Sequence, residues 1–78
     1  MTVRFTLLTR PECHLCEEFR DELGAAFAGR YELVEACVDD RADWRAAHGT
    51  VIPVLLDQRG AVVCRTRFDA GAVARALR

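Results

Sequence analysis

The most constraining feature of the sequence is a pair of cysteines, Cys13 and Cys16, placed where a strand pattern gives way to a helix pattern. Before them, Val3 to Leu8 alternates apolar and polar residues and is rich in β-branched and aromatic side chains, which predicts a strand. From Cys13 onward, apolar residues recur every four positions, which predicts an amphipathic helix ended by Gly29. These positions are Leu15, Phe19, Leu23 and Phe27.

The middle of the chain predicts a second strand and a short helix. Tyr31 to Val38 (YELVEACV) has the composition of a strand. We expect its buried positions to be Leu33, Val34, Ala36 and Val38. Asp39 or Asp40 can cap a helix that continues through Ala47, and Gly49 is a suitable stop.

The last third of the chain predicts a hairpin followed by a helix. Val51 to Leu56 and Ala61 to Cys64 are apolar runs separated by the turn residues 57–60. Asp69 is a good N-cap for a helix that runs to the C-terminus, and Phe68 before it can pack onto Val73.

The predicted order is β-α-β-α-β-β-α in one α/β domain, residues 1–78, because so short a chain holds a single core. A β-α-β unit needs a right-handed crossover between parallel strands, whereas a hairpin is antiparallel. We therefore expect a four-stranded mixed sheet with helices on both faces.

Composition narrows the class of protein. Hydrophobic residues make up 51% of the chain and charged residues 29%, a balance typical of a globular domain. The formal net charge is -1 and basic residues are scattered, so we expect no nucleic-acid partner. No apolar run approaches the length of a membrane span or a secretory leader. We expect a cytoplasmic monomer without a membrane partner.

The placement of the cysteine pair at a helix start favours redox chemistry. The first N–H groups of a helix lack internal partners, so they can stabilise a thiolate on Cys13 and lower its pKa. Cys16 lies one turn later on the same face. We expect Cys13 to attack a substrate disulfide and Cys16 to resolve the mixed disulfide.

Two other readings of the cysteines stay open. They could pack as small hydrophobic residues, or they could be half of a zinc site. The remaining candidate ligands, which are His14, Cys37, His48 and Cys64, form no second zinc-type spacing, so we predict no metal. A third class is an adaptor that keeps the fold and binds partners without turnover.

The segment LLTRPECHLCEE resembles the active-site segment of glutaredoxins, especially short bacterial glutaredoxin-like proteins, and the resemblance covers essentially the whole chain. It implies a thioredoxin-like fold and a thiol-disulfide oxidoreductase. Val51-Ile52-Pro53 is similar to the thioredoxin-fold loop whose proline is cis and faces the cysteine pair. In the family, the residue before this proline, here Ile52, pairs its main chain with the substrate. The resemblance thus implies a substrate site formed by Arg10, Pro11, His14, Ile52, Pro53 and Asp69.

The resemblance weakens at the segment that holds glutathione in this family. Glutathione-binding members have a Gly-Gly turn after the last strand, where this chain has Arg65-Thr66-Arg67-Phe68-Asp69. Arg10 stands where a cation could meet a thiol-peptide carboxylate, and Asp69 could supply a contact at a helix start. We expect no resident cofactor, with glutathione or another low-molecular-weight thiol as co-substrate. The expected partners are protein or small-molecule disulfides and a thiol reductant or reductase.

Several neighbouring residues have mainly structural interpretations. His14 can modestly tune the thiolate, while Glu12, Glu17 and Glu18 oppose it. Cys37 and Cys64 fall in predicted strands, where unpaired cysteine usually packs as a small hydrophobic residue. We expect Trp44 to pack rather than to bind, and His48 to supply a favourable charge at a helix end.

Overall fold

The computed structural model describes residues 2–78, which form four strands, three α-helices and one short 3-10 helix. The elements are β1 (Val3–Thr9), α1 (His14–Phe27), β2 (Tyr31–Cys37), η1 (Val38–Asp40), α2 (Ala42–His48), β3 (Val54–Leu56), β4 (Val62–Arg65) and α3 (Ala70–Ala76). Apart from η1, their order is the predicted one.

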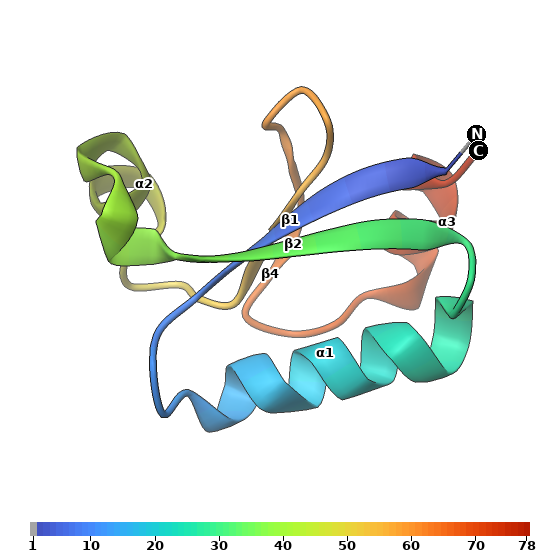
Figure 1. The fold of residues 1–78 in the computed structure, drawn as a ribbon, viewed down its shortest axis with the longest axis horizontal. Coiled ribbons are helices and arrows are strands. Elements are labelled where there is room, and N and C mark those ends of the chain that lie inside the picture. Colours follow the sequence, from blue (N-terminus) through green and yellow to red (C-terminus); the bar gives the residue numbers. More distant parts are fainter. Residues whose placement is uncertain (1) are drawn as a thin grey trace.

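The four strands form one mixed sheet in the order β2-β1-β3-β4. β1 pairs with β2 in parallel and with β3 antiparallel, and β3 pairs antiparallel with β4. α1 runs alongside the β1–β2 pair, as a crossover helix does (Figure 1). The predicted mixed sheet is therefore confirmed.

Two apolar clusters, one on each face of the sheet, make up the core. The first joins the sheet to α1 and α3 and consists of Phe5, Leu7, Phe19, Leu23, Leu55 and Val73. The second lies on the other face and consists of Leu8, Val38, Val54 and Leu56, with Trp44 of α2 packed against it. Helices therefore contact both faces, and Trp44 packs as predicted.

The predicted apolar stripe of α1 is wrong at its first position. Leu15 is 48% exposed, whereas Cys16, Phe19 and Leu23 are buried. A spacing of four residues overshoots the helical repeat of about 3.6, so the stripe rotates by about 40° at each step. The buried face therefore centres on Phe19 and Leu23, and Leu15 turns toward solvent beside the cysteines.

The segment after β2 also differs from prediction. Val38 is buried but belongs to η1, and Val34 is 47% exposed. Neither Asp39 nor Asp40 caps α2, because its N-cap is Arg41, whose side chain makes no capping bond. Instead, Asp39 accepts hydrogen bonds from an arginine 29 residues earlier in the chain.

The last strands are shorter or shifted relative to the prediction. β3 begins only after Pro53, consistent with the poor fit of proline inside a central strand. β4 starts at Val62 and extends to Arg65. The α3 start is as predicted, since the Asp69 carboxylate accepts a hydrogen bond from the Ala72 N–H at 3.1 Å.

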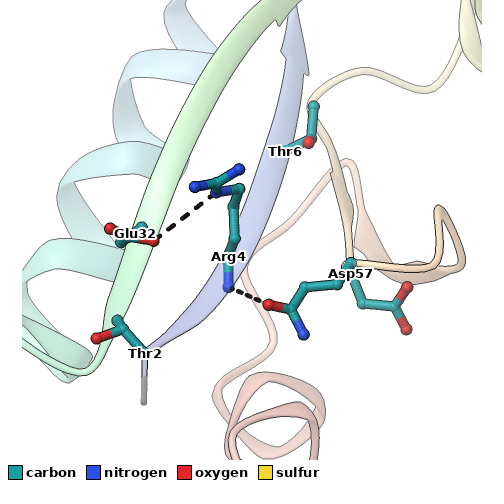
Figure 2. Close-up of a pocket in the computed structure, with 6 residues that line it drawn as sticks. Thr2, Arg4, Thr6, Glu32 and Asp57 are labelled. Carbon is teal, nitrogen blue, oxygen red and sulfur yellow. Dashed lines mark hydrogen bonds and ion pairs between the residues drawn. The ribbon is translucent and has the colours of Figure 1, made fainter.

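The face of the sheet that carries α2 is only partly covered. α2 has seven residues and packs against the Leu8 end, so the opposite end is an open polar pocket of about 520 Å³. Figure 2 shows its lining of Thr2, Arg4, Thr6, Glu32 and Asp57, with Gln58 accepting a hydrogen bond from the Arg4 N–H at 3.2 Å. Val34 pairs with Thr6 on this open region, which accounts for its exposure.

No helix formed by residues 2–78 has both the length and the apolar character that crossing a membrane requires.

Candidate active site

The candidate site is built around the first turn of α1, where Cys13 is the N-cap residue. Its sulfur accepts a hydrogen bond from the Cys16 N–H at 3.2 Å and is disulfide-bonded to the Cys16 sulfur. Cys16 is only 4% exposed and packs within the protein, whereas Cys13 is half-buried. The helix start thus supplies a donor to the more accessible of the two sulfurs.

The loop before the cysteines contains a left-handed residue. Pro11 and Glu12 form a turn, and Glu12 has a φ of 60°. This conformation is uncommon for a residue with a side chain, and residues of this kind concentrate at functional sites. The turn brings the chain from the end of β1 into the N-cap position of α1.

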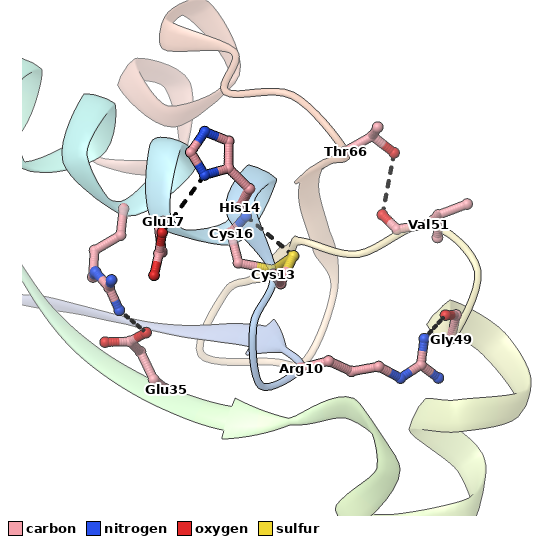
Figure 3. Close-up of a disulfide and its surroundings, with 10 residues drawn as sticks. Arg10, Cys13, His14, Cys16, Glu17, Glu35, Gly49, Val51 and Thr66 are labelled. Carbon is pink, nitrogen blue, oxygen red and sulfur yellow. Dashed lines mark hydrogen bonds and ion pairs between the residues drawn. A yellow bond between two sulfur atoms is a disulfide. The ribbon is translucent and has the colours of Figure 1, made fainter.

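Arg10, which the sequence suggests as a cation that could meet a thiol-peptide carboxylate, forms its hydrogen bonds within the protein. Its Nε and Nη2 donate to the two carboxylate oxygens of Asp39 at 2.9 and 3.0 Å, and its Nη1 donates to the Gly49 carbonyl. Figure 3 shows the side chain extending from the active-site loop toward Gly49. Hydrogen bonding to Arg10 holds the pKa of the Asp39 carboxyl below its usual value. Arg10 therefore ties the loop to η1 and to the end of α2.

His14 lies on the outside of α1 beside two carboxylates. Its Nδ1 is 3.8 Å from Glu17 (Figure 3). Its Nε2 is 3.3 Å from Glu18, and its side chain is 83% exposed. Glu12, also exposed, precedes Cys13 directly. The surroundings of the disulfide are thus rich in carboxylates.

The loop before β3 is held by the loop after β4. The Ile52–Pro53 peptide bond is cis, and Pro53 is buried. Thr66 donates its N–H to the Pro53 carbonyl at 2.7 Å and its hydroxyl to the Val51 carbonyl at 3.1 Å. Val51 and Thr66 both belong to the surroundings of the disulfide (Figure 3).

Thr66 adopts a backbone conformation that is rare for a β-branched residue. Its φ is 70°, and the Arg67 N–H donates to the Arg65 carbonyl at 2.7 Å, which closes a γ-turn. This is the segment where glutathione-binding glutaredoxins have the glycine pair. Two hydrogen bonds to the Pro53 loop hold the strained residue in place.

The remaining cysteines lie outside this disulfide. Cys37 ends β2, and its sulfur is 4.0 Å from an Asp39 carboxylate oxygen. Cys64 lies in β4 and packs against the first core cluster, where burial raises the pKa of its thiol. Among residues 2–78 no three His, Cys, Asp or Glu side chains gather as a metal would require.

A shallow pocket of about 200 Å³ reaches the disulfide from the side of β2. Both cysteines line it, together with Glu17, Arg20 and Glu35. Arg20 and Glu35 form an ion pair of 2.7 Å across it, the pair drawn at the left of Figure 3. A partner can therefore approach the half-buried Cys13 from this pocket, whereas Cys16 stays buried.

The structure gathers the cysteines, Arg10, Pro11 and His14 at the start of α1, and Val51 of the Val51–Pro53 loop lies among the surroundings of the disulfide together with its partner Thr66. Asp69 is the N-cap of α3, as predicted. Sequence reasoning missed the long-range contacts of Asp39 and Thr66. Nothing local marks these contacts, since each residue bonds to a segment far away in the sequence.

Comparison with known proteins agrees with this geometry. A family model described as "Glutaredoxin-like domain (DUF836)" matches residues 4–78. The chain belongs to this glutaredoxin-like family. The model spans nearly the entire chain, from β1 through α3.

A solved structure supports the same conclusion about the glutaredoxin-like fold. It is the X-ray structure of a structural-genomics target protein, XcR50 from X. campestris, which is 34% identical to this chain. The match covers 94% of this chain and 93% of that one, with a TM-score of 0.73. The fold is therefore thioredoxin-like, as the resemblance implied. A comparison with curated protein sequences found no significant match.

Proposed function

We propose that this glutaredoxin-like protein is a thiol-disulfide oxidoreductase in which Cys13 is the nucleophile and Cys16 the resolving thiol. The observation that carries the proposal is the N-cap geometry of Cys13. At the start of α1, its sulfur accepts a hydrogen bond from the Cys16 N–H and lies within bonding reach of the sulfur of the buried Cys16. Donors and the helix dipole at this position favour a thiolate.

The reaction begins with the reduced dithiol. The Cys13 thiolate attacks one sulfur of a substrate disulfide, so a mixed disulfide forms and the other substrate sulfur leaves as a thiolate. Cys16 then loses its proton and attacks the Cys13 sulfur, which releases the second substrate thiol. The substrate gains two electrons, and the protein is left with the Cys13–Cys16 disulfide. An external thiol, such as glutathione or another low-molecular-weight thiol, or a reductase returns the two electrons.

Main-chain groups near the site suit a substrate held in extended form. Among residues 2–78, neither the N–H nor the carbonyl of Ile52 takes part in a hydrogen bond, although Val51 and Pro53 on either side do. These groups could pair with the backbone of a substrate cysteine, as they do in the family. The expected substrates are protein or small-molecule disulfides, and a reducing compartment such as the cytoplasm suits the reaction.

The experiment is a trapping assay with a model disulfide. We expect Cys16→Ser to accumulate a mixed disulfide at Cys13, because the resolving step is lost, and Cys13→Ser to trap nothing. Mass spectrometry of the cysteine peptides identifies the trapped residue. Cys37→Ser is the matched control and should cycle like the wild type. Equal trapping by the first two variants would contradict the roles assigned here.

Zinc content, the reversibility of the Cys13–Cys16 disulfide and turnover of a disulfide substrate separate two other functions. A zinc-binding domain would copurify with metal and show no reversible disulfide between Cys13 and Cys16. An adaptor would keep its fold but would not turn over a disulfide substrate in the presence of a thiol reductant.

A further inference from the structure

A groove runs between α1 and the loop that joins β4 to α3. Its volume is about 370 Å³. The α1 wall is formed by Leu15, Glu18 and Glu22, and the loop wall by Thr66, Arg67 and Phe68. Thr66, which lines this groove, also belongs to the surroundings of the disulfide (Figure 3).

The groove contains apolar surface. Leu15 is 48% exposed, although it belongs to the series of apolar residues spaced four apart on α1. Phe68 is half-buried and meets the buried Phe19 edge to face, with ring centroids 5.7 Å apart. Leu15 and Phe68 therefore offer a strip on which an aliphatic side-chain stem can pack.

The α1 wall also carries excess negative charge. Glu18 and Glu22 are exposed and one turn apart, so they project along the same side of the helix. Among residues 2–78, Glu22 has no cation within ion-pair distance, and Glu18 has only the exposed His14 at 3.3 Å.

The arginines nearest the disulfide do not offset this charge, because each already has a carboxylate. Arg10 is paired with Asp39, and Arg20 with Glu35. On the opposite wall, Arg67 forms no ion pair within residues 2–78, and its charge would oppose a cationic ligand. The α1 wall thus favours a basic substrate side chain, whereas Arg67 on the loop wall disfavours one. The two effects can be tested separately.

We infer that the groove selects protein or peptide disulfides with a lysine or arginine a few residues from the reacting cysteine. Glu18 and Glu22 lie about 8 and 14 Å beyond Cys13 along the helix axis, at about 1.5 Å per residue. An extended chain advances about 3.3 Å per residue, so the basic residue falls roughly two to four positions from the cysteine. Its stem packs on Leu15 and Phe68, and its cationic head meets the two carboxylates. This inference rests on the proposed function.

The test uses the reduced wild-type protein and three peptides that differ at one position. Each peptide carries a single cysteine, disulfide-bonded to a neutral chromogenic thiol, with Lys, Gln or Glu three positions away. Attack of Cys13 on the peptide sulfur releases the chromogenic thiol. We expect the Lys peptide to react roughly three- to tenfold faster than the Glu peptide at low ionic strength. At about 0.5 M salt the ratio should fall toward one, because screening shortens the reach of surface charges.

Variants assign the preference to the groove. Glu18→Gln/Glu22→Gln should bring the Lys-to-Glu rate ratio close to one, and Arg67→Gln should increase it. The matched control is Glu32→Gln, which removes an exposed carboxylate in the open pocket of Figure 2 and should leave the ratio unchanged.

Three results would overturn the inference. They are equal wild-type rates for the Lys and Glu peptides, an unchanged ratio in the Glu18/Glu22 double variant, and slower reaction of all three peptides in Arg67→Gln. The last result would mean that Arg67 holds a substrate carboxylate. Reaction of the Gln peptide without any charge preference leaves the proposed function standing, whereas no Cys13-dependent reaction with any peptide contradicts both.

Discussion

Two leucines of α1 allow a direct test of which face of the helix is buried. Leu23 is fully buried in the first core cluster, whereas Leu15, two turns earlier, is 48% exposed. We compare Leu23→Ala with Leu15→Ala. Both changes remove the same atoms from the same helix, so the difference between them reports on burial alone.

The expected magnitudes are well separated. Replacing a buried leucine by alanine costs about 2–5 kcal/mol of unfolding free energy, because burial is lost and a cavity is left. For a half-exposed leucine we expect a loss below about 1 kcal/mol, since about half of its surface already meets water. A chain of this length has a total stability of roughly 4–12 kcal/mol, at about 0.05–0.15 kcal/mol per residue. Leu23→Ala should therefore remove a large share of it.

The assay is urea unfolding of the oxidised proteins followed by the fluorescence of Trp44, the single tryptophan. With a slope of about 1 kcal/mol per molar urea, the midpoint should fall by about 2 M or more for Leu23→Ala and by less than about 1 M for Leu15→Ala. Comparable shifts, or a larger one for Leu15→Ala, would show that Leu15 is buried and that the groove beside the disulfide is not open.

Two further predictions concern ionisable groups. In the reduced protein at mildly acidic pH, a limiting alkylating reagent should label Cys13 before Cys16, Cys37 or Cys64, because Cys16 is buried and burial raises the pKa of the Cys64 thiol. Peptide mapping that found Cys37 or Cys64 labelled first would contradict this. Hydrogen bonding to Arg10 lowers the pKa of Asp39 in the folded protein. The ionised carboxylate therefore stabilises the fold at pH values above the usual aspartate pKa of about 3.9. This stabilisation is lost as the pH falls through the lowered pKa of the folded state. Urea midpoints of the wild type should therefore exceed those of Asp39→Asn at pH 6 and converge with them in strong acid, and a constant gap would refute the ion pair.

Much of the fold could be predicted because the relevant signals are local. The strand before the cysteines, the helix after them and the Asp69 cap each depend on residues within a few positions of one another. The resemblance around the cysteine pair then implied the thioredoxin-like fold that the comparison supports. Periodicity fails where the assumed repeat differs from the true one, which is why the predicted apolar stripe includes the exposed Leu15.

The sequence by itself determined the order of the elements and the position of the cysteines at a helix start, because capping, turn formation and hydrophobic alternation act over a few residues. Tertiary structure decided which charges are available. Asp39 is a reasonable helix cap by local rules. It instead accepts hydrogen bonds from Arg10, because the parallel pairing of β1 and β2 brings the ends of these strands together. Likewise, Thr66 adopts its left-handed turn where the Val51–Pro53 loop accepts its two hydrogen bonds. Both outcomes depend on contacts between segments that only the assembled sheet places side by side.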